Sequence, residues 1–81
     1  MTACFYVLDV PENRGVIDVA EGTGVSIDRV GPYFRISGGS EIVVDRRASG
    51  ARHAVWYSVI AGLEGSTIAQ HDKNALRVVA V

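Results

Sequence analysis

The fold class is decided by residues 54–81, AVWYSVIAGLEGSTIAQHDKNALRVVAV. This stretch holds the only Trp of the chain, Trp56, among the Val, Ile and Tyr residues that favour strands. Gly62 and Gly65 interrupt it, and a polar run at residues 71–74 separates its last two apolar segments. We therefore expect strands at residues 54–61, 66–70 and 75–81, a turn at 62–65 and one turn of 3₁₀ helix at 71–74.

The upstream residues also alternate between short apolar runs and turn signals. Strands are expected at residues 2–10, 16–20, 25–30, 33–37 and 41–47. The glycines at 38–39 predict a hairpin between the last two of these strands, and residues 48–52 form a small polar loop. The pattern predicts one all-β domain over residues 1–81, a small barrel or a strongly bent antiparallel sheet of about five to seven strands with one short 3₁₀ turn.

A helical alternative stays open for two segments. Residues 66–79 place apolar side chains at helical spacing behind Ser66, which is a suitable N-cap. Residues 52–63 contain alanines that favour a helix. The two glycines and the many β-branched and aromatic residues favour strands instead, which is why the all-β fold is preferred.

The same C-terminal residues carry a resemblance to a known fold. The runs Trp56-Tyr57-Ser58-Val59, Gly62-Leu63-Glu64-Gly65 and Ala75-Leu76-Arg77-Val78-Val79 resemble the end of bacterial SH3 domains. The resemblance covers about a third of the chain and implies an SH3-like barrel. Ser66-Thr67-Ile68 stands where a second aromatic residue often follows the hairpin, so the usual aromatic peptide groove is not inferred.

A second SH3-like family is also similar. Gly65-Ser66 and Ala75-Leu76 resemble a turn and a closing strand of the short plasmid-borne type of dihydrofolate reductase, whose members are tetramers with a central pore. The run at residues 67–70, Thr-Ile-Ala-Gln, lacks the tyrosine of that family's functional strand. This resemblance therefore implies the barrel and not the reductase activity.

Composition limits the class of partner. The chain has 81 residues, of which 48% are hydrophobic, and a domain of this size has little interior in which to bury them. We therefore expect a homo-oligomer. The net charge of −1 gives no positive field to attract nucleic acid, so a nucleic-acid partner is not expected. No apolar run is long enough to span a membrane. With no signal peptide in the N-terminal residues, a cytoplasmic protein is expected.

The sequence contains no recognisable catalytic or metal-binding motif. His53 and His71 are far apart, without Cys or carboxylate residues at metal-ligand spacing. The lone Cys4 cannot form an internal disulfide and is expected to be buried and inert. The run at residues 21–24, Glu-Gly-Thr-Gly, lacks the lysine of a phosphate-binding loop. We predict no metal, no cofactor and no catalytic residue, and consider an enzyme the less favoured possibility.

The candidate binding residues fall into an aromatic and a cationic group. Of Trp56 and Tyr57, only one can face a core if both lie on a strand, so the other must lie on an outer face or in an interface. Arginines that flank the flexible loop can hold an anionic ligand or an acidic partner segment. The candidates are Trp56, Tyr57, Tyr33, Arg46, Arg47, Arg52 and His53.

The predicted function is that of a small homo-oligomeric β-barrel, which acts as a binding or interaction module for a peptide or for a small ligand such as an anion. The alternative is a small enzyme whose active site is assembled between subunits, with polar groups such as Gln70, His71 and Arg52 converging across an interface. A nucleic-acid-binding barrel is the third possibility, and it would show salt-dependent retention on DNA or RNA.

Overall fold

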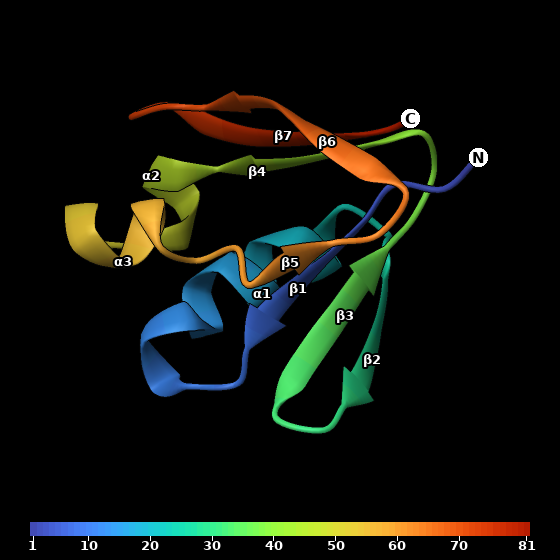
Figure 1. The fold of residues 1–81 in the computed structure, drawn as a ribbon. Helices are drawn as coiled ribbons and strands as arrows, with labels where there is room; N and C mark the ends of the chain where they lie inside the picture. The colour runs from blue at the N-terminus through green and yellow to red at the C-terminus, as the bar shows by residue number, and fades with distance from the viewer.

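Two antiparallel sheets face a common interior, with one helix beside the interior and two short helices at one end of the molecule (Figure 1). The computed structural model describes all 81 residues. In chain order, the elements are β1 (Cys4–Leu8), η1 (Pro11–Asn13), α1 (Arg14–Gly22), β2 (Ser26–Val30), β3 (Tyr33–Ser37), β4 (Glu41–Asp45), α2 (Arg46–Ser49), α3 (His53–Tyr57), β5 (Gly62–Leu63), β6 (Ser66–His71) and β7 (Ala75–Ala80).

The two sheets are open at their edges. The first has the strand order β2-β3-β1-β5 and the second has the order β4-β7-β6, and every neighbouring pair is antiparallel. Gly31, at φ 58°, closes the β2–β3 hairpin in a backbone conformation that costs glycine little. Because neither sheet closes on itself, the predicted SH3-like barrel is wrong.

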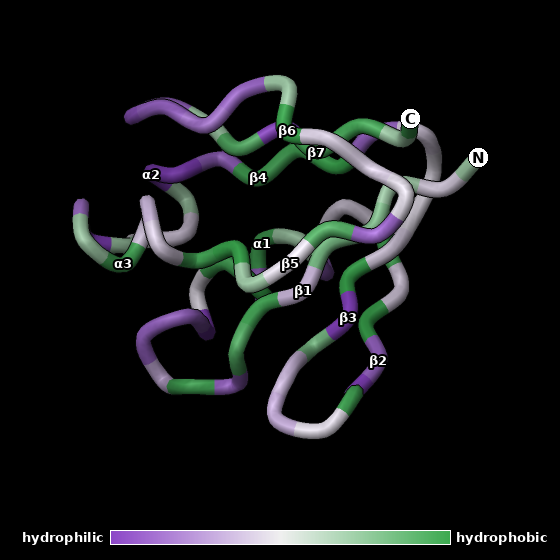
Figure 2. Tube along the Cα trace, viewed as in Figure 1, coloured by the Kyte–Doolittle hydropathy of each residue, from purple (hydrophilic) through white to green (hydrophobic).

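A single hydrophobic core lies between the two sheets. It contains 13 buried residues, contributed by both sheets, by α1 and by the segment around α3. Figure 2 shows strongly hydrophobic stretches in β4, β7 and α1 beside this interior. Each fully buried Val, Leu, Ile or Phe stabilises the fold by about 1.5–3 kcal/mol. The core residues are Ala3, Phe5, Val7, Val16, Ile17, Ala20, Ile36, Ile42, Val44, Trp56, Val59, Leu76 and Val78.

The predicted strand at residues 16–20 is instead the middle of helix α1. Val16, Ile17 and Ala20 are buried at the i, i+1 and i+4 spacing of one helix face, whereas Asp18 is exposed. Packing of that face against the core outweighs the low helix propensity of the β-branched residues.

The predicted strand at residues 54–61 is also wrong, because its first part is helix α3. Trp56 is fully buried, and its indole N–H donates a hydrogen bond to the carbonyl oxygen of Asp72, at 2.6 Å. A helix turn lets this large side chain enter the core while Tyr57, the next residue, stays exposed. The helical alternative for residues 52–63 was therefore partly right, and that for residues 66–79 was wrong, since β6 and β7 form a hairpin.

The predicted hairpin across residues 38–40 does not form. β3 pairs with β1 and β2, whereas β4 crosses to the other sheet and pairs with β7. The 3₁₀ turn is at Pro11–Asn13 rather than at residues 71–74, where His71 ends β6 and the next three residues connect it to β7. The strands expected near β1, β2, β3, β6 and β7 are present. The all-β prediction is nevertheless wrong, and the fold is α+β.

None of the helices combines the length and the apolar composition that crossing a bilayer requires.

Candidate functional site

Three elements that are distant in the sequence gather at one end of the molecule: α2, α3 and the turn between β6 and β7 (Figure 1). The backbone N–H of Arg46 donates to the carbonyl oxygen of Asn74, at 3.0 Å, and joins α2 to this turn. The Trp56 indole joins α3 to the same turn through Asp72. We call this region the helical end.

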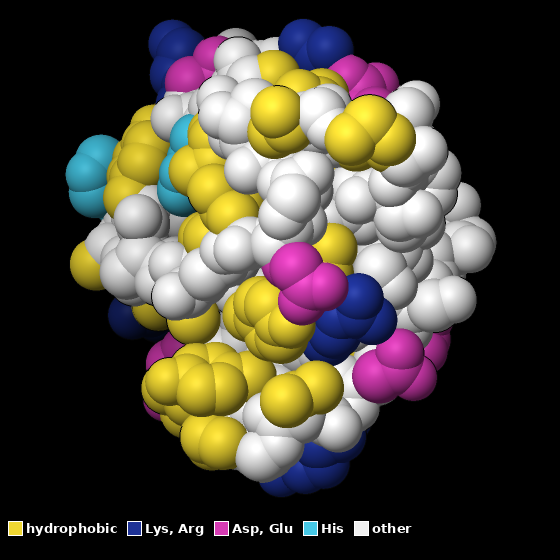
Figure 3. Space-filling view, turned by 45° about the vertical axis from the view of Figure 1, so that its right-hand side comes forward, with side chains coloured by type: hydrophobic (Ala, Val, Ile, Leu, Met, Phe, Trp, Pro, Cys, Tyr) yellow, Lys and Arg dark blue, Asp and Glu magenta, His cyan; other side chains and the backbone are white.

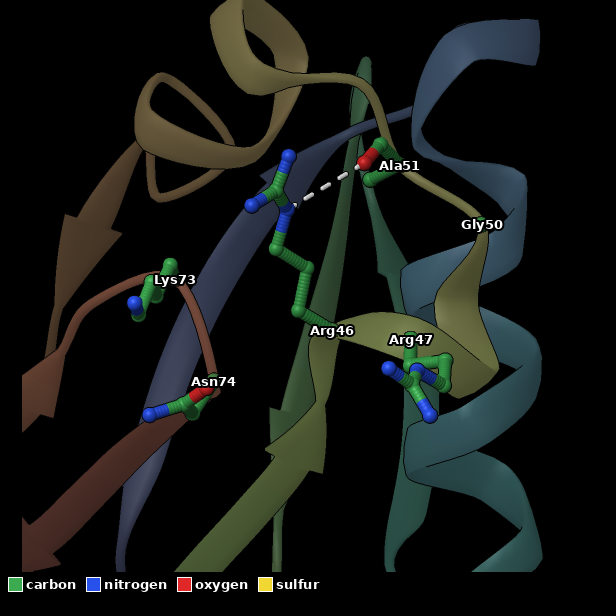
Figure 4. Close-up of a pocket in the computed structure, with 6 residues that line it drawn as sticks. All are labelled: Arg46, Arg47, Gly50, Ala51, Lys73 and Asn74. Carbon is green, nitrogen blue, oxygen red and sulfur yellow. Dashed lines mark hydrogen bonds between the residues drawn. The ribbon is translucent and has the colours of Figure 1, made fainter.

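An open pocket of about 520 Å³ lies at the helical end. We call it the basic pocket. Its lining comes from α2, from the residues just after α2 and from the β6–β7 turn (Figure 4). The lining residues are Arg46, Arg47, Gly50, Ala51, Lys73 and Asn74.

Local backbone chemistry places the pocket's arginines. Asp45 ends β4 and caps α2, because its carboxylate accepts a hydrogen bond from the backbone N–H of Ala48 at 2.9 Å. Gly50 ends α2 with φ 68°, a left-handed conformation that glycine adopts cheaply. The short helix between them therefore holds Arg46 and Arg47 at the pocket.

The cationic side chains of the pocket have no carboxylate partner. The three ion pairs of the chain involve Arg29, Arg35 and Arg77, all outside the pocket. Arg46 is half-buried, and its Nε donates to the carbonyl oxygen of Ala51 at 3.4 Å (Figure 4). Arg47 and Lys73 are exposed and make no side-chain hydrogen bond. The pocket therefore holds three cationic side chains that make no ion pair, with Asp45 lining a smaller pocket beside Arg47 and Lys73.

Two carboxylates near the basic pocket, those of Asp45 and Asp72, accept hydrogen bonds from backbone N–H groups. One carboxylate oxygen of Asp72 accepts from the backbone N–H groups of Asn74 and Ala75, at 2.9 and 3.1 Å, and the other accepts from the Gln70 amide. The hydrogen bond from Asn74, reinforced by that from Ala75, holds the pKa of Asp72 below its usual range. Asp45 is used as the cap of α2.

Aromatic rings and two histidines cover the other side of the helical end. The Tyr57 ring lies 4.8 Å from the His53 ring and 5.3 Å from the His71 ring, measured between centroids. His71 Nε2 lies 2.9 Å from the carbonyl oxygen of Trp56, which can only accept, so this nitrogen carries the proton. Trp56 is fully buried and cannot touch a partner, whereas Tyr57 is 42% exposed.

Tyr33 lies apart from the basic pocket, on the outer face of the first sheet. It pairs with Leu8 on one side and with Val30 on the other, and all three side chains are exposed. We call these three residues the apolar row. Figure 3 shows apolar side chains gathered near one acidic and one basic group on the visible face. Tyr33 and Leu8 also line a pocket of about 350 Å³ with Val55 of α3.

The structure therefore brings most of the predicted binding residues together. Arg46 and Arg47 line the basic pocket, and Arg52 lines an adjoining pocket with Ala51 and Val55. His53 and Tyr57 are on the neighbouring α3. Lys73 and Asn74 were missed, because only the β4–β7 pairing, which sets Asp45 opposite Ala75, brings their turn beside α2.

A further polar group, on the outer face of the first sheet, was also missed. The Tyr6 hydroxyl and the Arg35 guanidinium both donate to the Glu64 carboxylate. These contacts lower the pKa of Glu64, with the Tyr6 bond as the larger cause, and raise the pKa of Tyr6. The nearby Cys4 is buried, as expected, and this burial raises the pKa of its thiol. No group of three or more potential metal ligands forms in the chain.

Comparisons with known proteins find a match among the solved structures. No protein-family model matches the chain, and no curated protein matches it. A chain of a solved structure, that of the phenol hydroxylase–regulatory protein complex, matches with a TM-score of 0.80 and 9% sequence identity over 100% of both chains. At this identity the match shows the fold, and it contradicts the resemblance to SH3-like families.

The match also corrects the predicted function and partner. The homo-oligomeric β-barrel module is wrong because there is no barrel, and the same holds for the enzyme assembled between subunits of such a barrel. Homo-oligomerisation was expected to cover excess apolar surface, yet the two sheets and the helices bury 13 residues in their own shared core. The matched solved structure is, in addition, a complex of a phenol hydroxylase with its regulatory protein.

Proposed function

We propose that the chain is a regulatory protein of a monooxygenase of the phenol hydroxylase type and that it acts by binding the hydroxylase component. The observation that carries the proposal is the fold match, which extends over the whole of both chains with a TM-score of 0.80. The alignment covers 100% of both chains, so the matched chain is similar in size to this one. In this proposal the matched chain is the regulatory protein of that complex.

The surface of the chain supports a role in protein binding. Tyr57, Tyr33, Leu8 and Val30 are large apolar side chains that stay exposed although the core is complete. Aromatic residues are favoured in protein interfaces because they bury much area at a small entropic cost. Val55 of α3 lines both the pocket that contains Tyr33 and the pocket that contains Arg52. Tyr33, Tyr57 and Arg52 therefore lie around α3.

Regulation through binding has a defined thermodynamic requirement. A bound protein changes the hydroxylase only if it has a different affinity for two of the enzyme's conformations. In this proposal the chain contributes the contact surface, and the oxidation takes place in the hydroxylase. The rigid two-sheet core keeps that surface preorganised, which limits the entropy lost on association.

To test the proposal, the chain is added in increasing amounts to the hydroxylase component from the same organism. The rate of phenol oxidation is measured at each ratio of the two proteins. We expect the rate to change and to saturate at a fixed ratio of the two proteins, with a dissociation constant of about 1 μM or tighter. The Trp56→Ala variant serves as the inactive control, because we expect the loss of this buried side chain to unfold the protein. An unchanged rate at all ratios, together with no complex between the folded proteins, would contradict the proposal.

A further inference from the structure

The basic pocket carries a feature that its role in the fold does not explain. Arg46 and Arg47 come from α2, whereas Lys73 comes from a turn that is 26 residues further along the chain than Arg47. The fold brings these like charges to one pocket although their mutual repulsion destabilises it. Three of the eight cationic side chains of the chain have a carboxylate partner, and Arg46, Arg47 and Lys73 are among the five that have none.

We infer that the basic pocket docks an acidic segment of the hydroxylase, with Arg46, Arg47 and Lys73 facing its carboxylates. The inference rests on the proposed function and names the surface and the chemistry of the contact. An acidic partner segment relieves the repulsion among the three cations. Arginine is favoured at such contacts because its planar guanidinium pairs with carboxylates and is weakly hydrated.

The arrangement of the charges favours a protein segment over a small free anion. In Figure 4, Arg46 reaches toward Ala51, Arg47 projects away from it, and Lys73 lies on the separate turn, so the three charged groups do not converge on one point. Arg47 and Lys73 are also exposed to solvent. A single phosphate would reach few of these groups and would stay hydrated, whereas several carboxylates on one segment match a pocket of about 520 Å³.

The surroundings of the pocket fit the same partner. Asp45 and Asp72 are held by backbone N–H groups and do not neutralise the cations by direct pairing. The adjoining pocket holds one further cation, Arg52, together with one carboxylate, Glu12. The exposed ring of Tyr57 on the neighbouring helix supplies apolar area beside the charged contact.

Lys73 allows a direct test, since it is the only lysine of the chain. In the complex of the chain with the hydroxylase, a carbodiimide activates carboxylates, and an amine in contact with one forms an amide. We expect a crosslinked peptide that joins Lys73 to an Asp or Glu of the hydroxylase. Lys73→Arg keeps the charge and removes the amine, so it should abolish this crosslink while the complex still forms. A complex that yields no crosslink at Lys73 would count against the inference.

A matched pair of variants tests the charge itself. Arg47→Gln/Lys73→Gln removes two charges from the pocket, and Arg14→Gln/Arg29→Gln removes two charges elsewhere. We expect the pocket variant to bind the hydroxylase about tenfold more weakly at low salt and with a flatter salt dependence, and the control variant to stay within about twofold of wild type. Circular dichroism of both variants shows whether the fold is kept.

The outcomes separate this inference from the proposed function. A wild-type chain that forms no complex with the hydroxylase overturns both. A wild-type complex that Arg47→Gln/Lys73→Gln does not weaken overturns the docking inference alone. Inorganic phosphate at about 10 mM is expected to weaken the complex no more than chloride of equal ionic strength does. Stronger competition by phosphate would show a small-anion site and would contradict docking of an acidic segment.

Discussion

The indole N–H of Trp56 donates a hydrogen bond to the carbonyl oxygen of Asp72, at 2.6 Å, and this bond joins α3 to the β6–β7 turn. His71, next to Asp72, returns a contact to the carbonyl oxygen of Trp56 at 2.9 Å. A buried side chain thereby fixes the relative position of the two elements that carry Tyr57 and Lys73 on their exposed sides. The geometry of the helical end depends on this core residue.

The first prediction concerns this bond. Trp56→Phe keeps an aromatic ring but removes the indole N–H and leaves a gap in the core, so the free energy of unfolding should fall by about 2–4 kcal/mol. Urea denaturation followed by circular dichroism measures it. Tyr57→Ala, one residue away and exposed, should cost less than about 1 kcal/mol. Equal losses for the two variants would contradict the inward position of Trp56.

The second prediction concerns the contact between α1 and α2. A Cβ atom on Gly15 would lie 1.9 Å from the carbonyl oxygen of Ser49, so Gly15→Ala must push the two helices apart. We expect it to destabilise the protein by about 1–3 kcal/mol, although alanine favours a helix by about 1 kcal/mol over glycine. The thermal unfolding midpoint checks this effect.

Gly22 provides the matched control for that substitution. It lies in the same helix, and a Cβ atom there meets nothing within 4 Å. Gly22→Ala should therefore leave the stability unchanged or raise it by up to about 1 kcal/mol. A Gly15→Ala variant as stable as Gly22→Ala would show that α1 and α2 do not approach closely.

The third prediction concerns acid stability. The pKa of Asp72 is lowered in the folded protein by hydrogen bonds from Asn74 and Ala75, so the unfolded state binds its proton more readily. The stabilisation is present above the unfolded pKa of about 3.9 and is lost as the pH falls through the lower folded value. Asp72→Asn keeps an acceptor without the charge. Its unfolding midpoint in urea should therefore approach that of wild type as the pH falls below about 4. A constant difference from pH 7 down to about pH 2 would contradict the lowered pKa.

The fourth prediction concerns Tyr57 as a contact residue, which is a proposal. Tyr57→Ala should weaken binding of the hydroxylase by about fivefold or more without changing its salt dependence, because the lost contact is apolar. Tyr57→Phe keeps the ring and serves as the conservative control. Isothermal titration calorimetry at two salt concentrations measures both variants. If Tyr57→Ala binds the hydroxylase with the wild-type affinity, Tyr57 is not part of the interface.

The sequence predicts the strands better than the architecture. β3 is found at the predicted residues, and β2 and β7 nearly so, because alternating or β-branched runs between glycines signal strands locally. The partner of β4 is not signalled locally: the Gly38-Gly39 turn suggested β3, but β4 pairs with β7 across the chain. Pairing between distant strands depends on the core as a whole.

Helix α1 was missed, and α3 was predicted only as an alternative, for a related reason. The runs at Val16–Ala20 and His53–Tyr57 are rich in β-branched or aromatic residues, which favour strands in isolation. In the folded chain these side chains fill one shared core, and burial outweighs propensity. The cationic half of the site was predicted from Arg46, Arg47 and Arg52, which are close in sequence. Lys73 joins them only through the tertiary fold.

The central claim, that the chain binds a hydroxylase as a regulatory protein, is tested most directly by the mass of the particles in solution. Light scattering during size-exclusion chromatography measures this mass for the chain alone and for its mixture with the hydroxylase. We predict the monomer mass of 8.6 kDa for the chain alone and its co-elution with the hydroxylase in a fixed ratio. Separate elution of the two proteins, at concentrations of about 10 μM or more, would contradict the claim.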